Sequence, residues 1–199
     1  VRRENGRHVV VRDLEITADA GNVMEEPGRK KRYGIWVSAD QNGTYSGIIL
    51  KNLYIHHIFA SQQSESDGQQ ATSNLGMAIA ITTGSGQSRI RDVLIDSCDI
   101  RMTGHAGIRI SGVGRGDSIR FVEDVRILNN RLRHIGGPGM VPLRCRDVLV
   151  RGNVVDHSGS SIDPRMHARG SGIWPWTCED VIIEKNRFII FVVFFTILY

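Results

Sequence analysis

Hydrophobic residues recur along the chain in an eight-residue pattern that occurs six times. Each copy has apolar residues at positions one, three and eight, and position six, here called the key position, holds Leu, Cys or Asn. Alternation of apolar and other residues predicts a β-strand with one buried face. The shortest distance between key positions, 23 residues, indicates the length of the repeating unit. The copies are 9–16, 48–55, 93–100, 125–132, 148–155 and 181–188, with key residues Leu14, Leu53, Cys98, Asn130, Asn153 and Asn186.

A second, shorter strand is predicted between successive copies. It begins with Gly each time and again alternates apolar residues with others. No segment has a helical period, and Ile and Val number 41 against 19 for Ala and Leu. These features argue against a helical bundle and a doubly wound α/β domain, and they predict an all-β coil that stacks on itself. The Gly-led strands are 34–37, 76–79, 107–110, 139–142 and 172–175.

Stacking places equivalent residues of successive repeats about 4.8 Å apart. Opposite charges are then favourable neighbours, and the residue seven positions before the key alternates in sign from repeat to repeat. Asparagine at the last three key positions predicts an inward ladder in which each side-chain amide bonds to the next. The alternating charges are Arg91, Glu123, Arg146 and Glu179.

Segments 125–139 and 147–159 closely resemble the repeat units of the pectate lyase-like superfamily. The resemblance covers about residues 7–188 and implies a right-handed parallel β-helix of about five to six coils, as a piece of a larger protein. Parallel crossovers are nearly always right-handed, which agrees with this fold. The resemblance implies a polysaccharide as partner but says little about the reaction, because one architecture hosts many chemistries.

Three long insertions follow the first, second and fifth copies, at 17–33, 59–75 and 158–171. In a stack these loops would project on one side, beyond the short connections of the middle repeats, which predicts a cleft between them. The alternative is that surface loops tolerate extra length without any function. Outward residues of the Gly-led strands would line the floor of the cleft. Trp174, with Trp176 beside it, and Trp36 could stack on sugar rings, or they could pack beneath the loops. The predicted floor residues are Trp36, Ala78, Arg109, Val141 and Trp174.

Four arginines, Arg101, Arg109, Arg133 and Arg144, are expected near the middle coils, and together they would form a basic patch. Guanidinium groups bind carboxylates bidentately, which favours a uronate-containing polysaccharide as ligand. The alternative is that these arginines pair with carboxylates of the chain itself, such as Asp99.

Cleavage of such a polymer by β-elimination needs a base, a group that neutralises the carboxylate and an acid for the leaving oxygen. The candidate bases are His105, His134 and His167, with Arg109 as the neutralising group. A lone histidine is more often structural, and for His134 an inward stack with His57 and His157 is the better interpretation.

Hydrolysis instead needs two carboxylates at a suitable separation, and Asp156 and Asp163 are candidates. The chain lacks the adjacent Asp-Asp of polygalacturonase-like hydrolases and the Trp-x-Asp-His and Arg-x-Pro-x-x-Arg motifs of pectate lyases. No catalytic residue is therefore transferred from the resemblance.

No cofactor is indicated with certainty, and no metal ligand can be assigned. Ca²⁺ is possible, with oxygen ligands from Glu25-Glu26, Glu65 and Asp67, or Asp163. Cys145 and Cys178 occupy equivalent repeat positions, so they are expected to be inward apolar residues, with a cross-coil disulfide as the alternative.

The formal net charge of +4 comes without a dense Lys/Arg run or an RNA-binding motif, so nucleic acid is not an expected partner. The chain starts without Met or a signal segment, so we interpret it as a mature or internal fragment. The resemblance to β-helix proteins favours a piece of a larger secreted or cell-surface bacterial protein. We predict one β-helix domain at 1–188 and a separate apolar tail at 189–199. The tail is too short to cross a bilayer, which needs about 20 residues, and is either aberrant sequence after a truncation or a cap over the open end.

The sequence favours a carbohydrate-active protein that acts on an acidic polysaccharide by lyase or hydrolase chemistry in a groove along the strands. Two alternatives stay open. One is a non-catalytic carbohydrate-binding module, and the other is a structural β-helix of the adhesin type.

Overall fold

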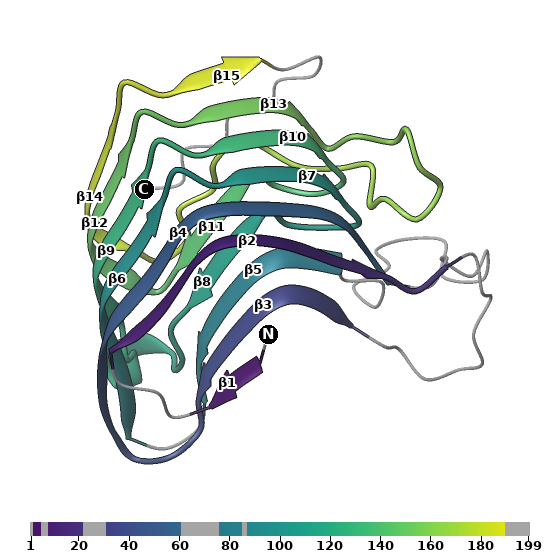
Figure 1. Cartoon of the computed structure of the whole chain (residues 1–199). Helices are drawn as coiled ribbons and strands as arrows, with labels where there is room; N and C mark the ends of the chain where they lie inside the picture. The colour runs from purple at the N-terminus through teal and green to yellow at the C-terminus, as the bar shows by residue number, and fades with distance from the viewer. Residues whose placement is uncertain (1, 5–7, 22–30, 61–75, 85–86, 190–199) are drawn as a thin grey trace.

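The computed structural model describes residues 2–4, 8–21, 31–60, 76–84 and 87–189. In these ranges the protein is all-β, with strands in parallel ladders and a short 3-10 turn at Gly116–Ser118 (Figure 1). One antiparallel bridge, between Val113 and Arg120, departs from the parallel arrangement. None of the described residues belongs to a helix long and apolar enough to cross a bilayer.

Four of the five predicted Gly-led segments, together with β1, build a five-stranded parallel sheet, whereas the fifth segment, 172–175, forms an isolated bridge from Ile173 to Met140 and no strand. The order of the sheet is β1-β3-β5-β8-β11, so each strand pairs with the equivalent strand of the next repeat. The β1 strand precedes the first copy of the repeat and pairs with β3. The strands are β1 (Arg2–Glu4), β3 (Arg32–Ala39), β5 (Gly76–Thr83), β8 (Ile108–Ser111) and β11 (Met140–Leu143).

The six copies of the eight-residue pattern build a ten-stranded parallel sheet. Its order is β14-β12-β9-β6-β4-β7-β10-β13-β15, and β2 pairs with β4. The long strand β4 bends, because its first half pairs with β6 and its second half with β7. No ladder joins this sheet to the five-stranded sheet within the described ranges. The strands are β2 (Val9–Asp19), β4 (Gly43–Phe59), β6 (Ser88–Asp96), β7 (Asp99–Thr103), β9 (Val122–Leu128), β10 (Arg131–Ile135), β12 (Cys145–Arg151), β13 (Val154–Ser158), β14 (Glu179–Glu184) and β15 (Arg187–Ile189).

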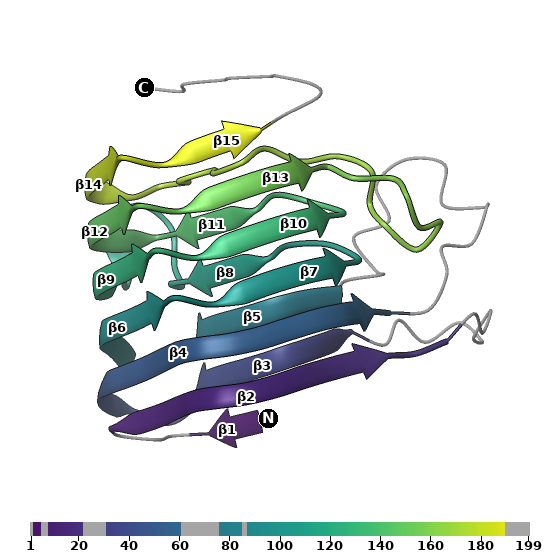
Figure 2. The ribbon, with the colours of Figure 1, turned by 45° about the horizontal axis from the view of Figure 1, so that its top comes forward.

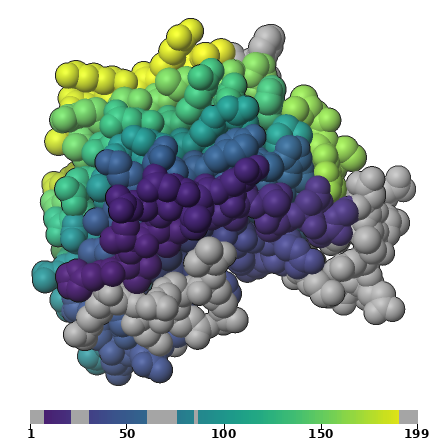
Figure 3. Space-filling model, viewed as in Figure 1, coloured from purple at the N-terminus to yellow at the C-terminus, as the bar shows by residue number. Residues whose placement is uncertain are grey.

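Successive repeats lie on top of one another from the N-terminal to the C-terminal end of the described chain (Figure 2). The space-filling view shows the same order as bands of side chains, from β2 to β15 (Figure 3). The register is the one that the repeat alignment predicts, because Val93, Val125, Val148 and Val181 are successive partners. The main core lies between the two sheets, and Ile, Val and Leu side chains fill it.

Residues in the left-handed backbone region recur at three positions of the repeat and mark its bends. One position is four residues after the key, where His57, Met102, His134 and His157 have φ between 51° and 58°. Asp and Asn predominate at the other two positions, six residues and one residue before the key. Asn, Asp and His enter this region more readily than other side chains. The histidine column is thus explained by backbone geometry.

The asparagine ladder predicted from the key positions is present. The backbone N–H of Cys98 donates to Asn130 Oδ1, that of Asn130 to Asn153 Oδ1 and that of Asn153 to Asn186 Oδ1, each over 2.9 Å. The last three members of the predicted charge ladder are present as well, because Arg146 lies 2.7 Å from Glu179 and 3.7 Å from Glu123. Arg91 is the register partner of Glu123. Both ladders follow from parallel, in-register stacking.

The predicted apolar tail falls almost wholly outside the described residues. Only Ile189, the last residue of β15, belongs to the described part. The division into 1–188 and 189–199 therefore stays a prediction.

Candidate functional site

The residues of the five-stranded sheet that point away from the main core form a continuous column, here called the outer column. Trp36, Ala80, Arg109 and Val141 are register partners on β3, β5, β8 and β11. Trp174 extends this column, because its N–H donates to Met140 O over 2.9 Å and Ile173 bridges Met140. Four of the five predicted floor residues thus lie side by side.

The prediction that Ala78 lines the floor of the cleft was wrong. Ala80 pairs with Arg109 in the outer column, where it is buried in a second apolar cluster, whereas Ala78 is fully buried against the main core. The reason is that β5 pairs with β3 two residues further along than the glycines suggest, since Gly76 is the partner of Arg32 and not of Gly34.

Trp174 and Trp176 form a flat aromatic surface at the C-terminal end of the outer column, here called the Trp pair. Their ring centroids are 5.2 Å apart and their planes differ by 7°. The side chains are 47% and 53% exposed, which is unusual for residues of this size. They stack because residues two apart on an extended segment point to the same side. The faces of two exposed indoles can bind the apolar face of a sugar ring.

Trp36, at the other end of the column, has a packing role as well. It stacks on Tyr33 with a centroid distance of 5.2 Å, and both rings pack against Met77, Ala80 and Ala106. Its Nε1–H donates to Thr82 Oγ1 over 3.3 Å. The packing alternative for Trp36 is therefore supported, although its side chain remains half-buried.

Arg109, at the middle of the column, and Arg144, at the end of β11, have no carboxylate in ion-pair contact among the described residues. Arg109 Nε donates to Ser111 Oγ over 3.2 Å, while the Nε of Arg144 is buried without a hydrogen-bond partner. Burial and the charge of Arg144 lower the pKa of Arg109, and Tyr33 opposes this effect. Burial also raises the pKa of Tyr33. These positive charges are available to an anionic ligand.

His105 and His167 meet beside Arg109, at the corner between β7 and β8. Their ring centroids are 5.0 Å apart, and the Nδ1 atom of each ring is buried without a hydrogen-bond partner. Burial, and then electrostatic repulsion from His167, when that ring is protonated, and from Arg109, lower the pKa of His105 to about 3. Burial and Arg169 also lower the pKa of His167. Both imidazoles are therefore neutral at neutral pH.

His167 reaches this place because the long insertion at 158–171 folds back over the preceding repeats. The N–H of His167 donates to Gly104 O over 2.8 Å, and that of Arg169 to Gly136 O over 3.2 Å. Arg165 anchors the loop on Asp19 and on the ring of Phe59, and it also pairs with Asp163 within the loop. The loop thus covers the short corners of the middle repeats, which the insertion pattern had predicted to stay low and open.

The predicted basic patch of four arginines was wrong. Arg101 and Arg133 lie on β7 and β10 of the ten-stranded sheet, and both bond to Asp99, which compensates one of their two positive charges. Only Arg109 and Arg144 lie at the five-stranded sheet. The sequence analysis grouped these four arginines because all of them lie in the middle repeats. In the structure they lie at two different sheets.

His134 lies on β10, in the column predicted from the repeat, and its ring is 5.0 Å from that of His157. Its Nδ1 is buried without a hydrogen-bond partner. His134 has no ring contact with His105.

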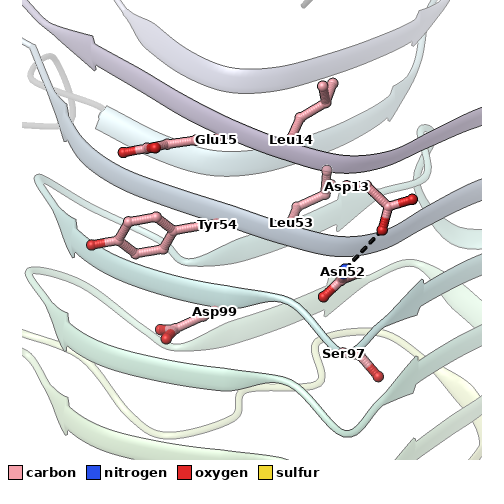
Figure 4. Close-up of a pocket in the computed structure, with 8 residues that line it drawn as sticks. All are labelled: Asp13, Leu14, Glu15, Asn52, Leu53, Tyr54, Ser97 and Asp99. Atoms are coloured by element: carbon pink, nitrogen blue, oxygen red, sulfur yellow. Dashed lines mark hydrogen bonds between the residues drawn. The ribbon is translucent and has the colours of Figure 1, made fainter.

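An open depression of about 350 Å³ on the ten-stranded sheet was missed by the sequence analysis (Figure 4). Three carboxylates, Asp13, Glu15 and Asp99, line it together with Tyr54. The repeat alignment contained the signal, because these residues come directly before and after the key positions of the first three copies. Glu15 Oε1 lies 2.8 Å from His56 Nε2.

The described residues contain no group of three or more His, Cys, Asp or Glu side chains placed to bind a metal ion. Asp163 bonds to Arg165, which holds the pKa of its carboxyl below the usual value. The other expected Ca²⁺ ligands, Glu25-Glu26, Glu65 and Asp67, lie outside the described residues, so a Ca²⁺ site there stays a prediction.

No protein-family model matches the chain. The chain is similar to the lacto-N-biosidase of Bifidobacterium longum subsp. longum, with 22% identity over 232 aligned positions. The alignment covers 90% of this chain but 14% of that enzyme, so the chain spans about one seventh of its curated relative.

Proposed function

We propose that the chain is a right-handed parallel β-helix unit of a secreted or cell-surface carbohydrate-active protein, which binds its polysaccharide along the outer column. The parallel in-register stacking, the asparagine ladder and the recurring bends support this fold. The observation that carries the functional proposal is the Trp pair, two exposed and nearly coplanar indoles at the end of a column that contains Arg109.

The substrate class follows from the charges beside the Trp pair. Arg109 and Arg144 have no carboxylate partner among the described residues, and half-buried guanidinium groups bind carboxylates strongly. A uronate-containing glycan would supply such carboxylates while its ring faces stack on the indoles. We therefore place an acidic sugar at Arg109 and its neighbour at the Trp pair.

His105 is the residue that we assign to proton transfer in β-elimination. Its neutral imidazole can accept a proton, and a bound carboxylate beside Arg109 would raise its pKa from the low value of the free protein. Arg109 would neutralise the substrate carboxylate, which makes the neighbouring proton more acidic. His167 contacts His105 and would hold its ring in place.

Glycoside hydrolysis is the second candidate, and two observations favour it. The similar protein is a glycosidase by its name, and hydrolysis uses a pair of carboxylates, which the depression with Asp13, Glu15 and Asp99 contains. This depression lies on the ten-stranded sheet, so substitutions in the depression and in the outer column test the two candidate sites separately.

A degradation screen tests both candidates. The folded protein is incubated with pectate, alginate, glycosaminoglycans and neutral glycans, with and without Ca²⁺, while reducing ends and near-ultraviolet absorbance are recorded. New reducing ends together with near-ultraviolet absorbance support elimination at the outer column. Both signals should be lost in Arg109→Gln and kept in the matched surface variant Arg126→Gln. Reducing ends alone, lost in Glu15→Gln, support hydrolysis. If neither signal appears, the remaining interpretations are binding, which Trp174→Ala would weaken, and a structural role.

A further inference from the structure

Cys145 and Cys178 occupy equivalent positions in two neighbouring repeats. Cys145 opens β12, and Cys178 directly precedes β14, next to the register pair Arg146 and Glu179 (Figure 2). Parallel neighbours lie about 4.8 Å apart, which falls inside the Cα separation of about 4.4–6.8 Å that a disulfide needs.

The backbone has the same shape on both sides of this pair. Arg144 and Thr177, the residues before the two cysteines, have φ of 53° and 52°. The N–H of Arg144 donates to Trp176 O over 2.9 Å, which fixes the two segments beside each other. The two Cβ atoms therefore leave their strands in matching directions.

The two sulfur atoms lie together under the end of β11. Cys178 Sγ is 3.2 Å from Pro142 O, and Cys145 Sγ is 3.7 Å from the next carbonyl, Leu143 O. The thiols are also within hydrogen-bonding reach of each other. Both are reduced in this structure, as is Cys98.

We propose that Cys145 and Cys178 are a disulfide site that cross-links the last two described repeats. The oxidant is a small-molecule disulfide such as oxidised glutathione. Cys178, the more exposed thiol, attacks it as the thiolate, forms a mixed disulfide and releases one glutathione thiolate. Cys145 then attacks the Cys178 sulfur and releases the second glutathione. The two protein protons end on the two glutathione thiolates, so the protein loses two protons and two electrons.

The surroundings of the two thiols support this order of attack. The hydrogen bond with Cys145 lowers the pKa of Cys178, which increases its thiolate fraction at neutral pH. The same contact, together with burial, raises the pKa of the fully buried Cys145. The first step is therefore expected at Cys178, and the second step should accelerate as the pH rises.

Cys98 is excluded from this chemistry by its position. It stands at a key position, its thiol bonds to Leu50 O and Asp96 O, and its register neighbours in the key column are Leu53 and Asn130. Burial raises the pKa of Cys98 to about 11. It should remain a thiol when the other two cysteines are oxidised.

The cross-link would hold the exposed edge strand β14, in which Ile182 is 57% and Ile183 is 42% exposed, to its partner strand β12. The loop that it closes, residues 146–177, contains the long insertion and the Trp pair. Closing a loop of this length restricts the unfolded chain and stabilises the folded one. An oxidising environment outside the cell would allow such a bond to persist.

The test oxidises the native protein with glutathione disulfide at mildly alkaline pH, quenches it by alkylation and maps the peptides. We expect the number of free thiols to fall from three to one, with one cross-linked peptide joining Cys145 to Cys178. The oxidised protein should also have a higher Tm, which dithiothreitol reverses. Cys178→Ser should keep the Tm of the reduced protein and show no response to either reagent.

Three results would overturn the proposal. They are a stable glutathione adduct on Cys178 without a cross-link, retention of all thiols in the folded protein, and a bond that involves Cys98. Because the peptide map is made on the unmodified sequence, the outcome does not depend on whether the serine variant folds.

Discussion

The backbone N–H of Asn130 donates a hydrogen bond of 2.9 Å to the side-chain Oδ1 of Asn153 in the next repeat. The same oxygen accepts from Asn130 Nδ2 over 3.0 Å, and Asn153 Nδ2 donates in turn to Ile127 O. Both asparagines are almost completely buried. A single side chain thus satisfies two backbone groups of the preceding repeat.

Asn153→Ala should therefore destabilise the protein more than an ordinary surface substitution. It leaves the buried N–H of Asn130 without an acceptor, and an unsatisfied buried group costs about 1–3 kcal/mol, so we expect a loss of about 3 kcal/mol in the free energy of unfolding. Urea denaturation measures it. Asn186→Ala is the control, because this half-buried residue ends the described ladder and should cost less. Equal losses in the two variants would contradict a ladder that matters most at its centre.

The neutral state of His105 predicts a pH dependence of stability. The folded-state pKa of about 3 lies below the unfolded value of about 6.5, so the unfolded chain binds a proton that the folded protein does not. Stability from this group is complete above pH 6.5 and falls as the pH drops toward 3, by at most about 1.4 kcal/mol per pH unit. His105→Gln should flatten the pH dependence of the unfolding free energy in this range. A wild-type imidazole that titrates near pH 6.5 by NMR would refute the explanation.

Arg165 should be the anchor of the long loop that carries His167. It is 8% exposed and bonds to Asp163 and Asp19. We expect Arg165→Met to cost about 2 kcal/mol, because hydrogen bonds to charged groups contribute about 1.5–3 kcal/mol. Limited proteolysis should detect faster cleavage within 158–171. Arg169→Met is the matched control, since this exposed arginine lies in the same loop, and it should leave the cleavage rate unchanged.

The pair of Arg165 and Asp163 also gives stability a dependence on acid. Arg165 lowers the pKa of Asp163, so this contribution is complete above the unfolded value of about 4 and is lost as the pH falls through the lower folded value. Arg165→Met should remove this part of the acid sensitivity. Unchanged acid midpoints in wild type and variant would show that the pair contributes nothing there.

The Trp pair gives a prediction for binding that rests on the proposed function. Trp174→Ala should weaken the affinity for a bound oligosaccharide by about tenfold, since an aromatic contact of this kind contributes about 0.5–1.5 kcal/mol beyond the area it buries. Isothermal titration with the substrate from the degradation screen measures the change. Ile182→Ala, an exposed position on the ten-stranded sheet, should bind as the wild type does.

The sequence alone determined most of the strands, their parallel stacking and the ladders, although it did not predict β1 and predicted a strand at 172–175 that the structure lacks. Parallel in-register pairing places the same repeat position of two neighbours side by side, so the repeat alignment was sufficient to pair Asn130 with Asn153 and Arg146 with Glu179. Trp36, Arg109 and Trp174 were placed in one column for the same reason. The sequence did not distinguish lyase, hydrolase and binding functions, because the fold itself carries no chemistry.

Only the tertiary structure decided what lies between the repeated positions. The Gly-led strands have no key residue to set their register, so a shift of two residues placed Ala80, and not Ala78, beside Arg109. Arg101 and Arg133 lie on strands of the ten-stranded sheet, whereas Arg109 lies on the five-stranded sheet. The arginines therefore do not form the expected patch. The course of the loop at 158–171 depends on contacts such as that of Arg165 with Asp19, 146 residues away. Long-range contacts of this kind leave no period in the sequence, and they bring His167 to His105.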